Sequence, residues 1–173
     1  SATAGLGDWY VDEAVFPDGL QTLTDYVINT GMEFGLWVEP EMVNPDSDLY
    51  REHPDWALNA APAPLLMARH QLVLDLTRPE VSDYLFERLD ALLDEYPITY
   101  LKWDMNRDIS QPGGRDGRAV AHRQTLAFYD LLNRVREAHP TVEIESCSSG
   151  GGRADYGVLA HTDRIWTSDN NDA

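Results

Sequence analysis

Short apolar runs alternate with longer amphipathic stretches along this chain. Each apolar run ends abruptly in polar residues, which is typical of strands that are covered on both faces in a parallel sheet. The longer stretches between them carry apolar residues at helical spacing and stop at glycine or proline. The pattern predicts four strands, at 32–38 (MEFGLWV), 98–103 (ITYLKW), 142–146 (VEIES) and 164–167 (RIWT).

The first predicted helix covers residues 18–30, before the first strand. Asp18 is a suitable N-cap, and Gly31 follows the end of the helix in the position where a left-handed residue is common. Its apolar residues fall on one face at helical spacing, so we expect this face to be buried; they are Leu20, Leu23, Tyr26 and Val27.

Three more helices are predicted after the first strand. The segment Thr77-Arg-Pro-Glu80 resembles a capping box and starts a helix that continues to about Tyr96. A second helix covers 119–138, with a stripe formed by Leu126, Tyr129, Leu132, Val135 and Arg136. A short helix follows at 154–161. The polar segment between the first strand and the capping box contains one extended stretch, 71–76, and is typical of a functional loop.

Strands that alternate with helices predict right-handed βαβ units and a parallel sheet. A doubly wound sheet and a (β/α)₈ barrel both satisfy this, but a barrel gathers all strand ends at one mouth, and every strand here ends in polar side chains. A complete barrel takes about 250 residues and eight strands. We therefore expect the α/β fold of a partial TIM barrel with about four βα units, in which 1–173 is a single fragment. The polar strand-end residues are Glu39, Glu41, Lys102, Asp104, Asn106, Cys147, Arg153, Asp169 and Asp172.

Acidic residues outnumber basic ones by 30 to 13, which gives a net charge of −17. This charge disfavours nucleic acid and anionic membranes as partners. No apolar run approaches the roughly 20 residues that span a bilayer. The first 50 positions hold no basic residue, so a signal peptide is not expected. The single cysteine, Cys147, forms no intramolecular disulfide. Together these features predict a cytoplasmic protein.

Two carboxylates at strand ends are candidates for catalysis. Asp104 follows an aromatic strand and lies in sequence beside Lys102 and Arg107, cations that would keep it ionised as a nucleophile if they are close in space. Retaining glycoside hydrolysis needs a second carboxyl group about 5 Å away. Asp169 and Asp172 both fit that role, and spacing does not choose between them. As an alternative for Asp104, a strand-terminal aspartate also caps turns.

Tryptophans lie at or beside three strand ends, at positions 37, 103 and 166. Their apolar faces suit the C–H faces of sugars, and core packing is the alternative, favoured for Trp166. The loop Ser148-Ser-Gly-Gly-Gly-Arg153 follows a strand, but it matches no phosphate-binding motif. The five histidines show no metal-ligand spacing. Cys147 has no histidine partner in sequence, which argues against a thiol nucleophile.

Two other classes of protein fit the same pattern. In a metal-dependent barrel of the enolase type, acids at successive strand ends bind Mg²⁺, and a lysine such as Lys102 acts as the base. A noncatalytic module that assembles with another chain is also possible, because a half barrel exposes apolar surface.

The strand ends resemble the catalytic domain of glycoside hydrolase family 36, the microbial α-galactosidases or melibiases. The resemblance covers nearly the whole chain in five ordered segments: GLWVEPEMVNPDSDLY (35–50), RHQLVLDLTRPEV (69–81), YLKWDMNR (100–107), IESCSSGGGR (144–153) and WTSDNNDA (166–173). It implies a (β/α)₈ barrel that hydrolyses terminal α-galactosides such as melibiose or raffinose with retention. No cofactor and no metal are implied.

The resemblance also implies roles for individual residues. Asp104 of KWDMNR matches the nucleophile of the family. The first aspartate of the SDN motif, Asp169, matches the acid/base and is thereby preferred to Asp172. The segments that line the galactose pocket contain Trp37, Arg69, Lys102, Asn106, Cys147 and Gly150, and we expect Trp103 to contribute as well. A relative that acts as a transglycosylase or on α-N-acetylgalactosaminides would share these motifs.

The sequence departs from the family pattern in two ways. Asn171 stands where the family commonly has threonine in SDNTDA. The paired-aspartate motif of an earlier strand is absent, as are the first two and last two barrel strands and the flanking β-domains of the family. The strands here correspond to the third to sixth of the family barrel. We therefore expect the isolated chain to be weakly active or inactive, and to need the rest of the barrel or a homo-oligomer.

Overall fold

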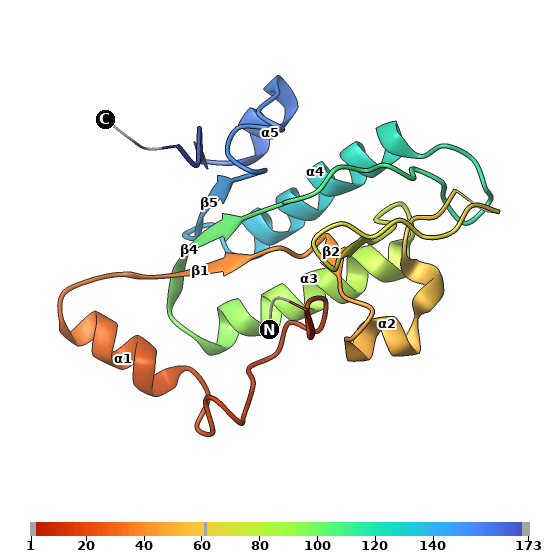
Figure 1. Ribbon diagram of the computed structural model, residues 1–173. Coiled ribbons are helices and arrows are strands. Elements are labelled where there is room, and N and C mark those ends of the chain that lie inside the picture. Colours follow the sequence, from red (N-terminus) through yellow and green to blue (C-terminus); the bar gives the residue numbers. More distant parts are fainter. Residues whose placement is uncertain (1–2, 61, 171–173) are drawn as a thin grey trace.

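The computed structural model describes residues 3–60 and 62–170. Helices and short strands alternate along the described chain (Figure 1). In chain order the elements are α1 (Gln21–Asn29), β1 (Phe34–Val38), β2 (Met42–Val43), α2 (Asp48–Glu52), the 3₁₀ helix η1 (Pro54–Trp56), β3 (Leu72–Val73), α3 (Pro79–Glu95), β4 (Ile98–Trp103), α4 (Ala121–Ala138), β5 (Glu143–Ser146), α5 (Tyr156–His161) and β6 (Arg164–Ile165).

The four predicted strands form one parallel sheet in the order β1-β4-β5-β6. The strand order follows the chain order without reversal, as in consecutive βα units of a barrel, whereas a doubly wound sheet reverses at a switch point. The predicted partial barrel is therefore confirmed, and the doubly wound alternative is wrong. All four strands end at the same edge of the sheet, so the polar residues that follow them gather there.

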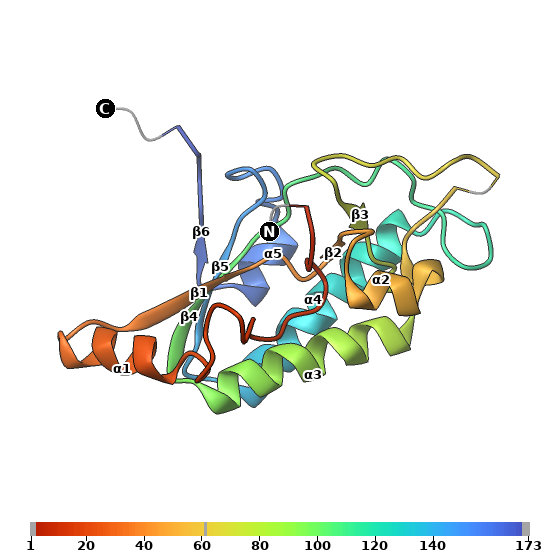
Figure 2. The same cartoon turned by 60° about the horizontal axis from the view of Figure 1, so that its bottom comes forward.

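The hydrophobic core lies between the sheet and helices α3 and α4, which run side by side along one face of the strands (Figure 2). Alternate strand residues point to this face, because side chains in a strand alternate. Leu101 of β4 and Ile144 of β5 are paired neighbours and are almost fully buried. Leu85 and Leu89 of α3 and Leu132 of α4 are covered from the helix side.

The opposite face of the sheet carries polar and aromatic side chains. The register aligns one residue from each strand across this face, in the row Trp37, Lys102, Glu145 and Arg164. Trp37 is 45% exposed. This face corresponds to the interior of a barrel, and within the described residues it is open along β1 and β6. None of the helices in the described part of the chain combines the length and apolarity that crossing a membrane would require.

Two predicted helix starts differ from the structure. α1 begins at Gln21, and its N-cap is Leu20, which makes no side-chain cap bond, so Asp18 is not the cap. The predicted capping box is wrong because both of its side chains have other partners. Thr77 donates its hydroxyl to Asp75, and Glu80 pairs with Arg78. α3 instead begins at Pro79, whose fixed φ suits the first helical turn.

The predicted buried faces of α1 and α4 are also partly wrong. In α1 only Thr24 is buried, and Leu23 and Tyr26 are exposed, because α1 contacts little beyond the start of β1. In α4 the buried face is rotated from the predicted stripe: Leu126 is 46% exposed, and the buried residues are Gln124, Phe128, Leu131, Leu132 and Val135. Gly31, in contrast, has φ +82° directly after α1, as predicted.

A small second sheet covers the edge at which the strands end. β2 was not predicted from the sequence, and it pairs antiparallel with β3, which lies inside the predicted extended stretch 71–76. Met42 and Val73 of this pair form a second apolar cluster with Leu58, Met105 and Val120. This packing fixes the loop that follows β1 against the loop that follows β4.

Candidate active site

Asp104 lies at the end of β4 and accepts hydrogen bonds from several directions. Its Oδ2 accepts from the indole Nε1 of Trp37 at 3.0 Å and from Nδ2 of Asn106 at 2.7 Å. Its Oδ1 accepts from the backbone N–H of Met105 at 2.9 Å. The thiol of Cys147 also hydrogen-bonds to this carboxylate. Asp104 is only 6% exposed, so these contacts hold it in a fixed orientation.

Burial opposes ionisation of Asp104, but the hydrogen bonds from Trp37, Asn106 and Cys147 outweigh burial and lower its pKa below the ordinary value. Hydrogen bonds to the charged form favour that form. The expectation that Lys102 and Arg107 provide this effect is wrong. Lys102 lies over the ring of Trp166, and Arg107 donates to the backbone carbonyls of Leu66 and Gln71. Asp104 is therefore ionised at neutral pH and suited to act as a nucleophile.

Cys147 and Gly150 follow β5 on the neighbouring strand. Burial raises the pKa of the Cys147 thiol to about 11, and the hydrogen bond to Asp104 adds to this effect. The thiol thus stays protonated and acts as a donor. Gly150 has φ +89°, and a Cβ there would lie 3.0 Å from Cα of Ser168. Only glycine lets this loop approach the segment after β6 so closely.

Asp169, in the segment after β6, is exposed, and it accepts a hydrogen bond from one described neighbour. The indole Nε1 of Trp166 donates to its Oδ1 at 2.8 Å. Nζ of Lys102 lies 3.7 Å from the centre of the Trp166 ring, and it is 3.8 Å from a carboxylate oxygen of Glu145. Trp166 is thus half-buried and points to the open face of the sheet, not to the core as the sequence favoured. Asp172 lies outside the described residues.

Arg69 lies at the tip of a hairpin turn in the loop before β3. Arg69 and His70 have φ of +54° and +60°, and Ala68 bridges Gln71 across them. Two consecutive positive φ values define the type I′ turn, which ordinarily carries asparagine or glycine. Nδ2 of Asn44 donates to the carbonyl of His70 and anchors the turn. The side chain of Arg69 is exposed.

Trp103 is a core residue. Its buried position does not allow the ligand contact that we expected from the sequence. It is fully buried and packs against Phe128 on the helix face of the sheet. Its Nε1 donates to Oε1 of Glu41 at 3.2 Å, and the same oxygen pairs with Arg153 at 2.6 Å. Glu41 and Arg153, expected at the mouth, pair with each other; Glu41 is buried and Arg153 is partly buried.

Glu39 and Gln71 belong to the site, although sequence spacing gave no signal that joins them. Glu39 accepts from the backbone N–H of Asn106 and from Nε2 of Gln71. Thirty-two residues separate Glu39 from Gln71. The β2–β3 pairing that brings them together was not predicted, so only the structure identifies this contact.

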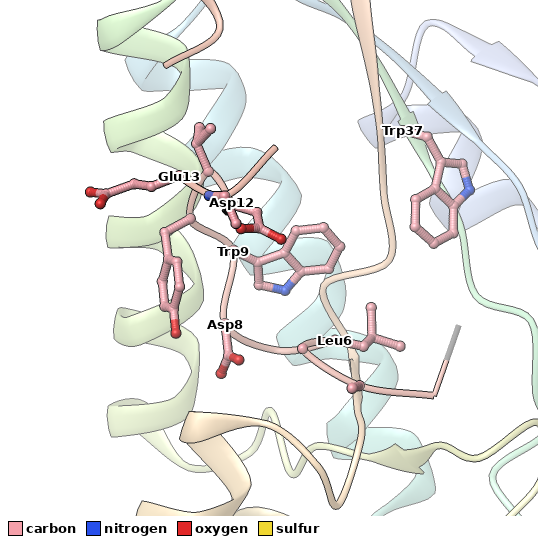
Figure 3. A pocket seen from close by; sticks show the side chains of 11 residues that line it. Leu6, Asp8, Trp9, Asp12, Glu13 and Trp37 are labelled. Atoms are coloured by element: carbon pink, nitrogen blue, oxygen red, sulfur yellow. Dashed lines mark hydrogen bonds between the residues drawn. The ribbon is translucent and has the colours of Figure 1, made fainter. Parts of the chain in front are cut away.

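A cavity of about 740 Å³ opens beside Trp37 (Figure 3). Figure 3 shows Trp37 on one side and Leu6, Asp8, Trp9, Asp12 and Glu13 of the N-terminal segment on the other. Trp37 lines this cavity, and its Nε1 donates to the carboxylate of Asp104. Asp104 itself does not line the cavity, so Trp37 lies between the cavity and the carboxylate.

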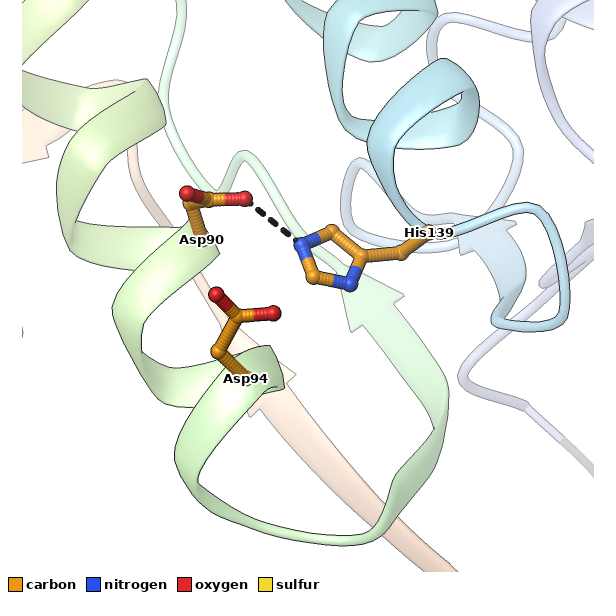
Figure 4. Close-up of side chains that lie close together, drawn as sticks. All are labelled: Asp90, Asp94 and His139. Atoms are coloured by element: carbon orange, nitrogen blue, oxygen red, sulfur yellow. Dashed lines mark hydrogen bonds and ion pairs between the residues drawn. The ribbon is translucent and has the colours of Figure 1, made fainter.

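The three side chains of Asp90, Asp94 and His139 form a group with metal-ligand composition (Figure 4). Nε2 of His139 is 2.8 Å from Oδ1 of Asp90, so these two already pair across α3 and the end of α4. Both helices end there, before β4 and β5 begin, and the group thus lies at the opposite edge of the sheet from Asp104. It takes no part in the site described above.

The whole chain, residues 1–173, matches the family model described as Melibiase. An α-galactosidase of Escherichia coli is 55% identical over 170 residues, which are 98% of this chain and 24% of that protein. The α-galactosidase AgaA of Geobacillus stearothermophilus is 46% identical over 97% of the chain. The crystal structure of this GH36 enzyme superposes with a TM-score of 0.94 over 99% of this chain and 25% of its own.

The chain thus spans about a quarter of the length of the curated relatives it matches. Another crystal structure, a variant of AgaA in complex with raffinose, is 44% identical with a TM-score of 0.94. The chain thus matches these α-galactosidases in both sequence and fold. This match supports a glycoside hydrolase and argues against the metal-dependent barrel of the enolase type. This chain belongs to the melibiase family of α-galactosidases, glycoside hydrolase family 36.

Proposed function

We propose that this chain is the part of an α-galactosidase barrel that carries both catalytic carboxylates, and that it works within a larger protein. The observation that carries the proposal is the environment of Asp104. It is a nearly buried carboxylate at the end of a barrel strand, kept ionised by hydrogen bonds from Trp37, Asn106 and Cys147. The open face of the sheet, on which Trp37 and Lys102 lie, is the side from which a sugar would approach it.

In the proposed reaction, Asp104 attacks the anomeric carbon of a terminal α-galactoside while Asp169 protonates the leaving glycosidic oxygen. The glycosidic bond breaks, and a covalent galactosyl ester forms on Asp104. Asp169, now a carboxylate, takes a proton from water, whose oxygen attacks the same carbon and releases galactose with retention. The exposure of Asp169 suits this role, since it must exchange protons with the leaving group and with water.

The proposed substrates are galactosides of the raffinose type. Variants of the related AgaA were crystallised in complex with raffinose and with stachyose. Around Asp104, the open face presents Trp37, Lys102 and Asn106, which offer an aromatic surface and hydrogen-bond donors to sugar hydroxyls. Cys147 is buried and contributes through its hydrogen bond to Asp104. Arg69 and Gly150 belong to loops at the same edge. Trp103 is left out because it has no exposed surface.

The isolated 173-residue chain is expected to hydrolyse an aryl α-galactoside at a small fraction of the rate of a complete family member. The physical reason is that, in the part of the chain that the structure describes, the outer edges of β1 and β6 are unpaired. We also expect further barrel strands to supply sugar contacts that this open face lacks. The measurement compares the chain with the E. coli relative and with that relative carrying this chain in place of its matched segment. The chimera is expected to restore turnover. Full activity of the isolated chain, or an inactive but folded chimera, would refute the proposal.

Arg69→Gly is expected to separate ligand binding from stability. Glycine relieves the strain of a positive φ, so the free energy of unfolding should stay equal or rise by about 1 kcal/mol at most. The unfolding midpoint in denaturant should rise accordingly. The loss of the guanidinium should raise KM for the galactoside severalfold with little change in kcat. His70→Gly is the matched control, because it relieves the neighbouring φ of +60° and leaves Arg69 in place. Equal effects of the two variants on KM would contradict a binding role for Arg69.

A further inference from the structure

Glu39 is a buried carboxylate that the proposed reaction does not use. It lies just after β1 and is 1% exposed. Neither an Arg nor a Lys side chain is paired with it among the described residues; it accepts instead from two neutral N–H donors, of Gln71 and Asn106. Burial raises the pKa of Glu39, the hydrogen bonds from Asn106 and Gln71 offset part of this, and the negative charge of Asp104 adds to the rise. An unpaired buried carboxylate is costly, so its retention here calls for a role.

The contacts of Glu39 lead directly to the candidate nucleophile. Oε1 of Glu39 accepts from the backbone N–H of Asn106 at 2.7 Å, and Nδ2 of Asn106 in turn donates to Oδ2 of Asp104 at 2.7 Å. Oε2 of Glu39 accepts from Nε2 of Gln71 at 2.8 Å. Arg107 holds the carbonyl of Gln71 from the other side. The turn after β4 is thereby fixed at the residue that orients Asp104.

We propose that Glu39 is a positioning residue, which holds Asn106 so that its amide stays on Oδ2 of Asp104. This inference rests on the proposed function, because it assigns Glu39 to the support of the proposed nucleophile. Without the anchor, Asn106 loses its fixed backbone position and the Asp104 carboxylate loses a donor. Loss of a hydrogen bond to a charged group in the reacting state lowers kcat by roughly 10- to 100-fold.

Two variants separate position from charge. In Glu39→Gln, the amide oxygen still accepts from Asn106. The buried Oε1 of Gln71, which has no hydrogen-bond partner among the described residues, can accept from the new amide after the Gln71 amide flips. This variant removes the charge and keeps the anchor. Glu39→Ala removes both. Removal of a nearby negative charge lowers the pKa of Asp104, whereas loss of the Asn106 donor raises it. The titratable group that faces Glu39 is Asp104; Gln71 and Asn106 are neutral.

The experiment measures the pKa of Asp104 in each variant by carbon-13 NMR of the carboxyl group, in the chain and in the chimera described above. We expect a higher pKa of Asp104 in Glu39→Ala than in Glu39→Gln. In the chimera, the acid limb of kcat/KM should move in the same sense, and kcat should fall in Glu39→Ala but be largely kept in Glu39→Gln. Adding Glu39→Ala to Asn106→Ala should cost little more, because both act through one contact.

Glu41→Gln is the matched control, since it removes another buried carboxylate two residues away that contacts Trp103 and Arg153. It is expected to lower stability and to leave the pKa of Asp104 unchanged. Equal pKa values of Asp104 in Glu39→Ala and Glu39→Gln, or additive losses with Asn106→Ala, would overturn the positioning role. The NMR titration needs no turnover, so an inactive chimera would count against the proposed function alone.

Discussion

Asp104→Asn is expected to reduce α-galactoside turnover by on the order of 10⁴-fold in the chimera described above, because it removes the nucleophile while leaving a side chain of the same shape. The fold should persist, although the amide nitrogen replaces an acceptor that serves Trp37 and Asn106. The measurement is the rate with an aryl α-galactoside, together with covalent labelling by a mechanism-based galactosyl inhibitor. Mass spectrometry should place the label on Asp104 and find none in the variant.

Asp108→Asn is the matched control for this substitution. It lies in the same turn, is exposed, and its side chain contacts none of the groups around Asp104 that the structure describes. Its turnover should stay within about twofold of the unmodified protein, as for surface substitutions in general. A label on another residue, or equal loss of turnover in the control, would reject Asp104 as the nucleophile.

Trp103→Ala is expected to destabilise the fold by about 3–5 kcal/mol, the range for removal of a fully buried large aromatic side chain. The substitution leaves a cavity against Phe128 and removes the indole N–H that donates to the carboxylate of Glu41. In urea unfolding followed by circular dichroism, the midpoint should fall sharply, because this loss is a large share of the roughly 5–15 kcal/mol that stabilises an ordinary domain.

Trp37→Ala provides the comparison, because it removes the same side chain from the neighbouring strand at a position that is 45% exposed. Its unfolding midpoint should change little, while the affinity for a galactose-type inhibitor should fall in the chimera. The two tryptophans would then divide into one that supports the core and one that faces the ligand. A larger loss of stability for Trp37→Ala than for Trp103→Ala would contradict this division.

The pattern of the sequence was sufficient for the sheet and for its main helices. β4 matches the predicted strand at 98–103, and α3 and α4 differ from the predicted ranges by a few residues. Helix starts were less predictable, because side chains such as Thr77 have several possible partners and the tertiary structure selects Asp75. The pairing of β2 with β3 was not predicted, because strands of two residues are too short to show the alternation of apolar and polar positions.

For the site, sequence reasoning found the residues but not their contacts. Asp104 was a candidate from its place at a strand end, and the reason expected for its charge was a pair of nearby cations. The structure shows neutral donors instead, from Trp37, Asn106 and Cys147. These residues belong to three different strand ends, and only the register of a parallel sheet places them around one carboxylate.

The sequence by itself determined that this chain is a run of βα units whose strands end in polar residues, because hydrophobic periodicity and strand-end polarity are local properties. The tertiary structure decided which face of each strand is buried, and therefore that Trp103 belongs to the core while Trp37 and Trp166 lie on the open face. It also decided that Glu39 meets Asn106 across 67 residues of chain. Such contacts depend on packing between distant segments, which no local pattern encodes.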